Sequence, residues 1–234
     1  MEAGSALGED DHACLAAPHS LRTVLQRRQL RQPVIKLGTV VYLIGGPPRC
    51  GKSVLARRLT TDHAIPFVPT DLIWAVVEVS QPEWRTPMPK GPERIPTAAK
   101  MFEPYLERAV QFLHPVRQPY GIEGEVISPE AAMKLRAAFD VRAVFLVRLT
   151  ATDADIADSK GPNPWLAAAA PDVVASVTAE VRSWSRQVES ACRRLGIPCF
   201  DASGDFERAM ADAADALMGD ARPAQKATDP ARPR

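Results

Sequence analysis

Apolar and polar positions along the chain fall into blocks that predict strands and helices in turn. Short apolar runs with the composition of buried parallel strands lie at residues 39–44, 65–69, 120–122, 141–147 and 197–200. Longer segments with helical spacing of apolar residues lie at 53–61, 71–79, 98–113, 129–138, 173–195 and 205–217. This alternation predicts an α/β domain with a parallel sheet and right-handed crossovers.

The two ends of the chain differ from this central part. Residues 1–18 are small, polar and acidic, and residues 221–234 are rich in Pro and Ala, so both segments are predicted to be disordered. Residues 19–35 predict a short helix, and the main domain is expected over residues 38–218. Inside the domain, residues 80–97 and 149–171 are predicted to be long loops, which are typical of lids and binding loops.

One motif of specific chemistry lies between the first predicted strand and the first predicted helix. The pattern G-x-x-x-x-G-K-[ST] is met by Gly46, Pro47, Pro48, Arg49, Cys50, Gly51, Lys52 and Ser53. Such a loop, called a P-loop, surrounds a phosphate with backbone N–H groups and the N-terminus of the next helix. Lys52 is expected to bind the β- and γ-phosphates of ATP, and the Ser53 hydroxyl is expected to ligate Mg²⁺. We therefore expect the whole motif to bind nucleotide.

Charge and cysteine content argue against several classes of protein. The chain has 29 Lys and Arg against 28 Asp and Glu, and a net charge of +1 does not favour a nucleic-acid or anionic-membrane binder. The four cysteines form no C-x-x-C pair, which favours a reducing cytoplasm over a disulfide framework or a zinc site. Cys50 either is redox-sensitive or fills a position for a small residue. We see no signal peptide and no membrane-spanning stretch, so we expect a cytoplasmic location.

Signatures of the larger P-loop classes are missing from the sequence. It has no guanine-reading N-K-x-D, no strand ending in an Asp-Glu pair, and no L-S-G-G-Q. The chain resembles the P-loop small-molecule kinases through residues 45–53, 68–71 and 122–125. This group includes nucleoside monophosphate kinases, shikimate kinase and chloramphenicol phosphotransferase, and the greatest similarity is to 2-phosphoglycerate kinase-like proteins. The resemblance implies a three-layer P-loop NTPase fold, with a five-stranded parallel sheet of order 2-3-1-4-5 and both substrates at the strand C-termini.

Two acidic positions complete the expected site. Asp71 follows the second strand, where it would accept a proton from an acceptor hydroxyl or hold Mg²⁺ through water. It could instead cap the next helix, although Thr70 is available for that purpose. Glu123 ends the third strand, where it would hold Mg²⁺ or its water, or would be an ordinary strand-end residue. The expected catalytic residues are thus Lys52, Asp71 and Glu123, and the expected metal ligands are Ser53, Asp71 and Glu123.

The two predicted loops leave the acceptor half of the site open. Loop 149–171 lies where the resembling kinases have an arginine-bearing lid, but here its only basic residue is Lys160. Positive charge would then come from Arg49, Arg148, Arg182 or Arg186. Loop 80–97 contains Trp84, Arg85, Lys90 and Arg94. These residues could recognise an anionic acceptor, but an ordinary solvated loop explains them equally well.

These features together predict an ATP- and Mg²⁺-dependent kinase that acts on a small-molecule acceptor. Two other functions fit the same motif. One is a nucleotide-binding regulatory ATPase, slightly favoured by the acidic lid. The other is a toxin-like kinase that acts on a nucleotide sugar or a drug. Neither nucleic acid nor a membrane is an expected partner, and the identity of the acceptor is not encoded in a recognisable motif.

Overall fold

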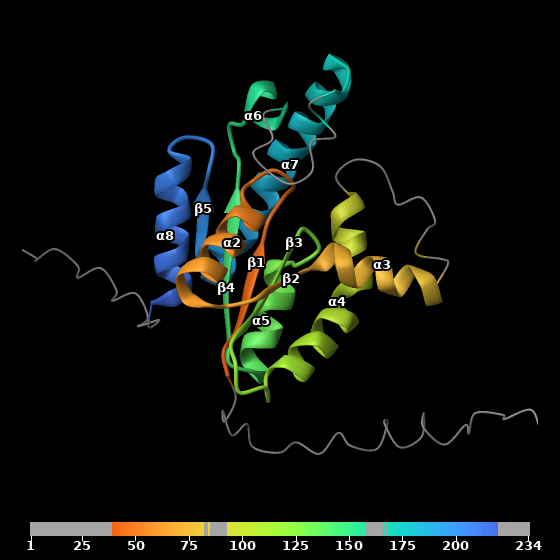
Figure 1. The fold of residues 1–234 in the computed structure, drawn as a ribbon. Coiled ribbons are helices and arrows are strands. Elements are labelled where there is room, and N and C mark those ends of the chain that lie inside the picture. Colours follow the sequence, from red (N-terminus) through yellow and green to blue (C-terminus); the bar gives the residue numbers. More distant parts are fainter. Residues whose placement is uncertain (1–38, 82–83, 85–92, 158–165, 167, 220–234) are drawn as a thin grey trace, which may run out of the picture. The chain divides into compact units, whose positions relative to one another are not determined.

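A computed structural model describes residues 39–81, 84, 93–157, 166 and 168–219 of the 234-residue chain. A five-stranded sheet lies at the centre of this part (Figure 1). Its strands are β1 (Val41–Gly45), β2 (Phe67–Pro69), β3 (Tyr120–Gly124), β4 (Val141–Val147) and β5 (Cys199–Asp201). All neighbours pair in parallel, in the order β2-β3-β1-β4-β5. The predicted α/β class and strand order are confirmed.

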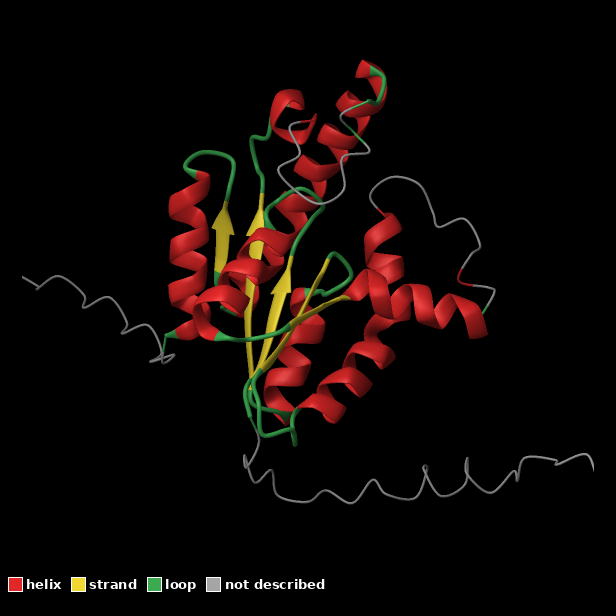
Figure 2. Cartoon of the chain, viewed as in Figure 1, coloured by secondary structure: helices red, strands yellow, loops and turns green. Residues whose placement is uncertain are grey.

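Helices follow each strand and cover both faces of the sheet, as Figure 2 shows. They are α2 (Lys52–His63), α3 (Thr70–Ser80), α4 (Arg94–Leu113), α5 (Pro129–Ala138), α6 (Asp153–Ala157), α7 (Pro171–Leu195) and α8 (Phe206–Met218). Local sequence signals explain several of their ends. The Ser128 side chain accepts a hydrogen bond from the N–H of Ala131 at the start of α5, and Gly196 adopts the left-handed conformation that closes α7.

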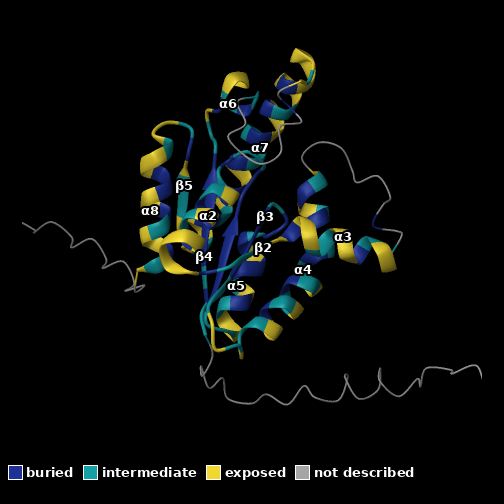
Figure 3. Ribbon diagram, in the orientation of Figure 1, coloured by how far each residue is buried: buried dark blue, intermediate teal, exposed yellow. Residues whose placement is uncertain are grey.

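The two faces of the sheet carry separate hydrophobic layers, because successive residues of a strand point to opposite sides. Leu43 and Phe145 belong to a cluster with buried residues of α4, α5 and α7. Ile44 and Leu146 belong to a second cluster with buried residues of α2 and α8. Figure 3 shows the buried strands and the exposed outer surfaces of the helices. The predicted three-layer arrangement is therefore present.

Some predicted boundaries are wrong by a few residues. Residues 94–97 belong to α4 rather than to the predicted loop over 80–97. Pro96 is compatible with a helix there, because N–H groups in the first turn have no partner within the helix. The predicted loop over 149–171 contains the short helix α6. The predicted disordered ends, the helix over 19–35 and parts of both loops lie outside the described residues.

Among the described residues, no helix is both long enough and apolar enough to cross a bilayer.

Candidate functional site

The loop between β1 and α2 has a backbone conformation that requires glycine at two positions. Gly46, Arg49 and Gly51 all have positive φ angles, of 131°, 65° and 100°. A Cβ atom at Gly46 would collide with the backbone oxygen of Leu146 on β4, and one at Gly51 would press on the ring of Phe206. The loop is thus fixed between β4 and α8, and its two motif glycines are needed for packing as well as for access to a ligand.

We expect Gly46→Ala to lower the free energy of unfolding by roughly 3 kcal/mol, because the added methyl group meets a backbone atom and the φ angle is strained. Gly204→Ala is the matched control, since a Cβ atom at Gly204 would meet open space. Chemical denaturation of both variants measures the difference. Equal stability of the two variants would show that the loop conformation described here is wrong.

Lys52 and Cys50 both donate hydrogen bonds within the loop. The Lys52 ammonium lies 2.7 Å from the carbonyl oxygen of Pro47, and its residue is only 9% exposed. An ammonium has three donors, so two are left for ligand oxygens. The Cys50 thiol lies 2.8 Å from the same oxygen, and burial raises its pKa. A buried thiol with a raised pKa is a poor nucleophile, which favours packing over redox sensitivity for Cys50.

Ser53, in the first turn of α2, contacts the end of β3. Its hydroxyl donates a hydrogen bond of 3.0 Å to Glu123 Oε1. This contact is possible because β1 and β3 are paired, with Ile44 opposite Glu123 and Gly45 opposite Gly124. The G-x-x-x-x-G-K-S motif thus lies between the strand β1 and the helix α2, as a P-loop requires. These residues form a P-loop.

Glu123 is a buried carboxylate beside this P-loop. The residue is 9% exposed, and burial raises the pKa of its carboxyl. The positive charge of Lys52 and the hydrogen bond from Ser53 oppose that rise, while the negative charge of Asp71 adds to it. A desolvated carboxylate of this kind gains free energy when a cation binds next to it.

Asp71 lies in the first turn of α3, and its side chain is exposed. Pro69 is the N-cap of this helix, and no side chain caps it. Thr70, which was available as a cap, is instead the first helical residue, and Gly124 leaves the space into which its side chain packs. Asp71 does not cap the helix either. Burial raises the pKa values of Glu123 and Glu125, and the negative charge of Asp71 adds to both rises, so Asp71 lies near both carboxylates.

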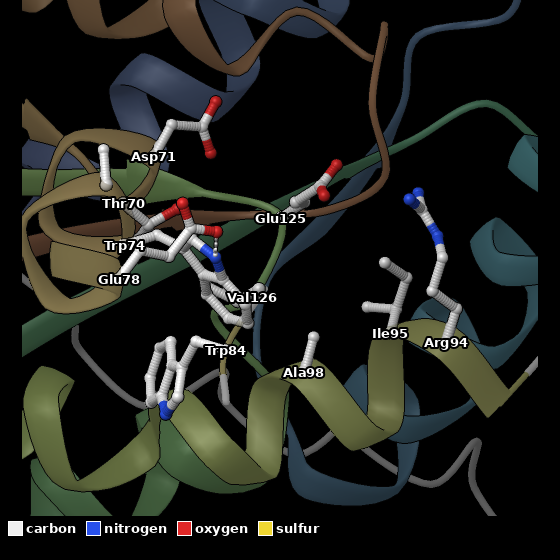
Figure 4. Close-up of a pocket in the computed structure, with 11 residues that line it drawn as sticks. Thr70, Asp71, Trp74, Glu78, Trp84, Arg94, Ile95, Ala98, Glu125 and Val126 are labelled. Carbon is white, nitrogen blue, oxygen red and sulfur yellow. Dashed lines mark hydrogen bonds between the residues drawn. The ribbon is translucent and has the colours of Figure 1, made fainter. Parts of the chain in front are cut away.

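A cavity of about 400 Å³ lies beside these carboxylates (Figure 4). Its volume is within the range of small-molecule sites. The lining comes from α3, from Trp84, from the start of α4 and from the segment after β3, and consists of Thr70, Asp71, Trp74, Ala75, Glu78, Trp84, Arg94, Ile95, Ala98, Glu125 and Val126. Asp71 thus lines the cavity, and its charge also acts on Glu123, which contacts the P-loop. Two members of the predicted binding loop, Arg85 and Lys90, lie outside the described residues.

Trp74 and Glu78 were not recognised from the sequence as site residues. A signal for them exists, because positions 71, 74, 75 and 78 follow the spacing of one helix face. Once Asp71 is assigned to the site, the same face of α3 places Trp74 and Glu78 next to it. Glu125, two residues after Glu123, also lines the cavity, and burial raises the pKa of its carboxyl.

Two of the arginines expected to neutralise phosphate contact the start of the segment after β4. Arg148 donates a hydrogen bond of 3.3 Å to the carbonyl oxygen of Asp155, and Arg182 donates one of 2.6 Å to that of Ala151. Arg182 therefore ties Ala151 to α7, and Arg148 ties Asp155 to the end of β4. Arg186 is exposed on α7, and Arg49 is half-buried within the P-loop.

Solved structures with a similar chain path include three small-molecule kinases. A gluconokinase from Sinorhizobium meliloti 1021 is 13% identical, with a TM-score of 0.45 over 76% of this chain and 91% of that one. A shikimate kinase from Bacteroides thetaiotaomicron is 13% identical (TM-score 0.44, 77% and 96%), and one from Aquifex aeolicus is 16% identical (0.43, 77% and 97%). No family model and no curated protein matches the sequence. Similarity at this level assigns no activity.

Proposed function

We propose that this chain is a cytoplasmic ATP-dependent kinase that transfers the γ-phosphoryl group of ATP to a hydroxyl group of a small molecule. The observation that carries the proposal is that Asp71 lines the 400 Å³ cavity and also acts by its charge on Glu123. Glu123 accepts the hydrogen bond from Ser53 of the P-loop. The cavity and the P-loop are thus linked through these two carboxylates. A regulatory ATPase needs a phosphate site but has no need of an adjacent acceptor cavity.

The residues around Ser53 fit Mg²⁺. This ion is usually held by one or two carboxylates, several waters and phosphate oxygens, so a hydroxyl and a desolvated carboxylate form a suitable donor set. Among the described residues no group of three or more His, Cys, Asp or Glu could hold a metal ion, so the ion would depend on phosphate for further ligands. When bound, Mg²⁺ would supply positive charge to the β- and γ-phosphate oxygens.

Each residue then has a role in the transfer. Lys52 neutralises charge on the phosphate oxygens from inside the P-loop, and backbone N–H groups of the loop hold them in place. The acceptor oxygen attacks the γ-phosphorus, and the bond from that phosphorus to the bridging oxygen of ADP breaks. Asp71 receives the proton of the acceptor hydroxyl. Ser53 and Glu123 would hold the metal.

Glu123→Gln tests the metal site. We expect the Mg²⁺ concentration needed for half-maximal activity to rise about tenfold, because the neutral amide keeps the hydrogen bond from Ser53 but loses the charge. A titration of activity with Mg²⁺ at saturating nucleotide measures this change. The control is Glu130→Gln, an exposed carboxylate on α5 that pairs with Arg194. An unchanged Mg²⁺ requirement in Glu123→Gln would remove Glu123 from the metal site.

The experiment that tests the proposed function is a screen of acceptors. Purified protein with Mg²⁺ and ATP is mixed with a broad set of hydroxyl compounds, and ADP release is recorded for each one. We expect at least one compound to raise ADP release about tenfold or more above the rate with water alone, since positioning an acceptor converts hydrolysis into transfer. Release that no compound stimulates would favour the regulatory ATPase.

A further inference from the structure

The charges around the cavity favour one class of acceptor over another. Three carboxylates line it, those of Asp71, Glu78 and Glu125, and the described lining has one guanidinium group, that of Arg94. Burial raises the pKa of Glu125, and the positive charges of Lys52 and Arg94 oppose that rise. Asp71 has a role with the acceptor hydroxyl in the proposed transfer. The charge of Glu78 is therefore left without a counter-charge among the described lining residues.

We propose that the acceptor is a small hydroxyl compound that also carries an amino group, and that its ammonium binds to Glu78 beside the Trp74 indole. The proposal rests on the proposed kinase function, since it treats this cavity as the acceptor site. It names the class of substrate that the P-loop alone leaves open. An acceptor with a carboxylate or phosphate group would instead meet three carboxylates and one guanidinium group, that of Arg94.

Glu78 and Trp74 form one rigid unit. The Trp74 indole N–H donates a hydrogen bond of 2.6 Å to Glu78 Oε1, which fixes the carboxylate and the ring relative to each other (Figure 4). An ammonium is attracted both to a carboxylate and to the face of an indole ring. Because this unit forms without a ligand, little side-chain entropy remains to be lost when one binds.

A second layer of aromatic side chains supports this unit. The ring centroids of Trp74 and Trp84 are 4.4 Å apart. Those of Trp84 and Tyr105 are 4.9 Å apart, with the rings in an edge-to-face arrangement. Trp74 also stacks on the buried ring of Phe102 at 6.3 Å. These contacts hold the wall of the cavity in place from α4, so that an apolar ring or carbon chain of the acceptor can pack against it.

Thr70 gives an observation independent of the acidic residues. The residue is 1% exposed and lines the cavity, yet its hydroxyl has no hydrogen-bond partner in the described structure. A buried hydroxyl without a partner costs free energy that a ligand can recover. A hydroxyl-bearing acceptor supplies such a partner, and Thr70 adjoins Asp71, which would take the proton.

Binding of matched compounds tests the proposal. Two sets share a carbon skeleton and differ in charge: glucosamine, glucose and gluconate, and 2-amino-1,3-propanediol, glycerol and glycerate. Calorimetry with the full chain, Mg²⁺ and a non-hydrolysable ATP analogue gives each Kd. We expect the amine of at least one set to bind about tenfold more tightly than its carboxylate partner, on the order of one charge-assisted contact.

Glu78→Gln links this preference to the residue. The amide oxygen still accepts the Trp74 hydrogen bond, so only the charge is lost. We expect the amine-to-carboxylate ratio to fall to about twofold or less, while Glu189→Gln, a paired carboxylate on α7, leaves it unchanged. Tighter binding of the carboxylates, no binding of either amine, or an unchanged ratio in Glu78→Gln would overturn the proposal. Binding of the ATP analogue in the same runs reports on the nucleotide site separately.

Discussion

Replacing Asp71 with Asn is expected to lower kcat for phosphoryl transfer by about 10²–10⁴-fold, the range for loss of a general base. The amide has almost the same shape but cannot accept the proton of the acceptor hydroxyl. The Kd for ATP with Mg²⁺ should change by about twofold or less, because the nucleotide is expected to bind to the P-loop residues Lys52 and Ser53 and not to Asp71. Transfer to the best acceptor and a nucleotide titration measure the two quantities.

The fold should tolerate this substitution. Asp71 is exposed in the first turn of α3, and the helix is not capped by any side chain. Asp62→Asn, an exposed change on α2, serves as the control for loss of a surface charge. Full transfer activity in Asp71→Asn would remove Asp71 from the chemistry. Loss of nucleotide binding would move it to the phosphate side of the site.

Replacing Lys52 with Met is expected to lower kcat/KM for ATP by about 10²–10³-fold, as loss of a buried charge aimed at a phosphate does. Met keeps the length and apolar volume of a residue that is 9% exposed. Burial raises the pKa of Glu123, and the Lys52 ammonium opposes that rise. Removal of the ammonium should therefore raise this pKa further and weaken metal binding. Steady-state kinetics with varied ATP give the effect.

A matched change elsewhere keeps this result interpretable. Lys134→Met removes an exposed ammonium on α5 that pairs with Glu103 at 2.8 Å, and it should leave kcat/KM unaltered. Thermal unfolding of both variants separates loss of function from loss of folding. An ATP affinity in Lys52→Met equal to that of the unaltered chain would mean that the P-loop does not bind nucleotide as described.

The P-loop could be predicted from the sequence because its chemistry is local. Eight consecutive residues specify the loop, and strong apolar runs mark the strand before it. The contact of Ser53 with Glu123 is different, since it joins residues 70 positions apart. It depends on the pairing of β1 with β3, which only the resemblance to P-loop kinases implied.

The acceptor cavity could not be predicted in the same way. Its walls come from α3, α4 and the segment after β3, and no continuous motif spans them. Apolar residues of α3 were also misleading, because Leu72, Val76 and Val79 are exposed while the polar Glu78 lines the cavity. Arg94 was assigned to a loop, although α4 already begins there. Tertiary packing outweighed the local pattern at each of these positions.

The fate of the γ-phosphoryl group tests the central claim most directly. ATP labelled with ³²P at the γ position is incubated with Mg²⁺, the unaltered chain and the acceptors that stimulate ADP release, and the products are separated. The kinase account predicts a labelled organic phosphate that matches the ADP formed, and about 10²–10⁴-fold slower formation of that product with Asp71→Asn. Label found only in inorganic phosphate, in amounts equal to ADP, would contradict it.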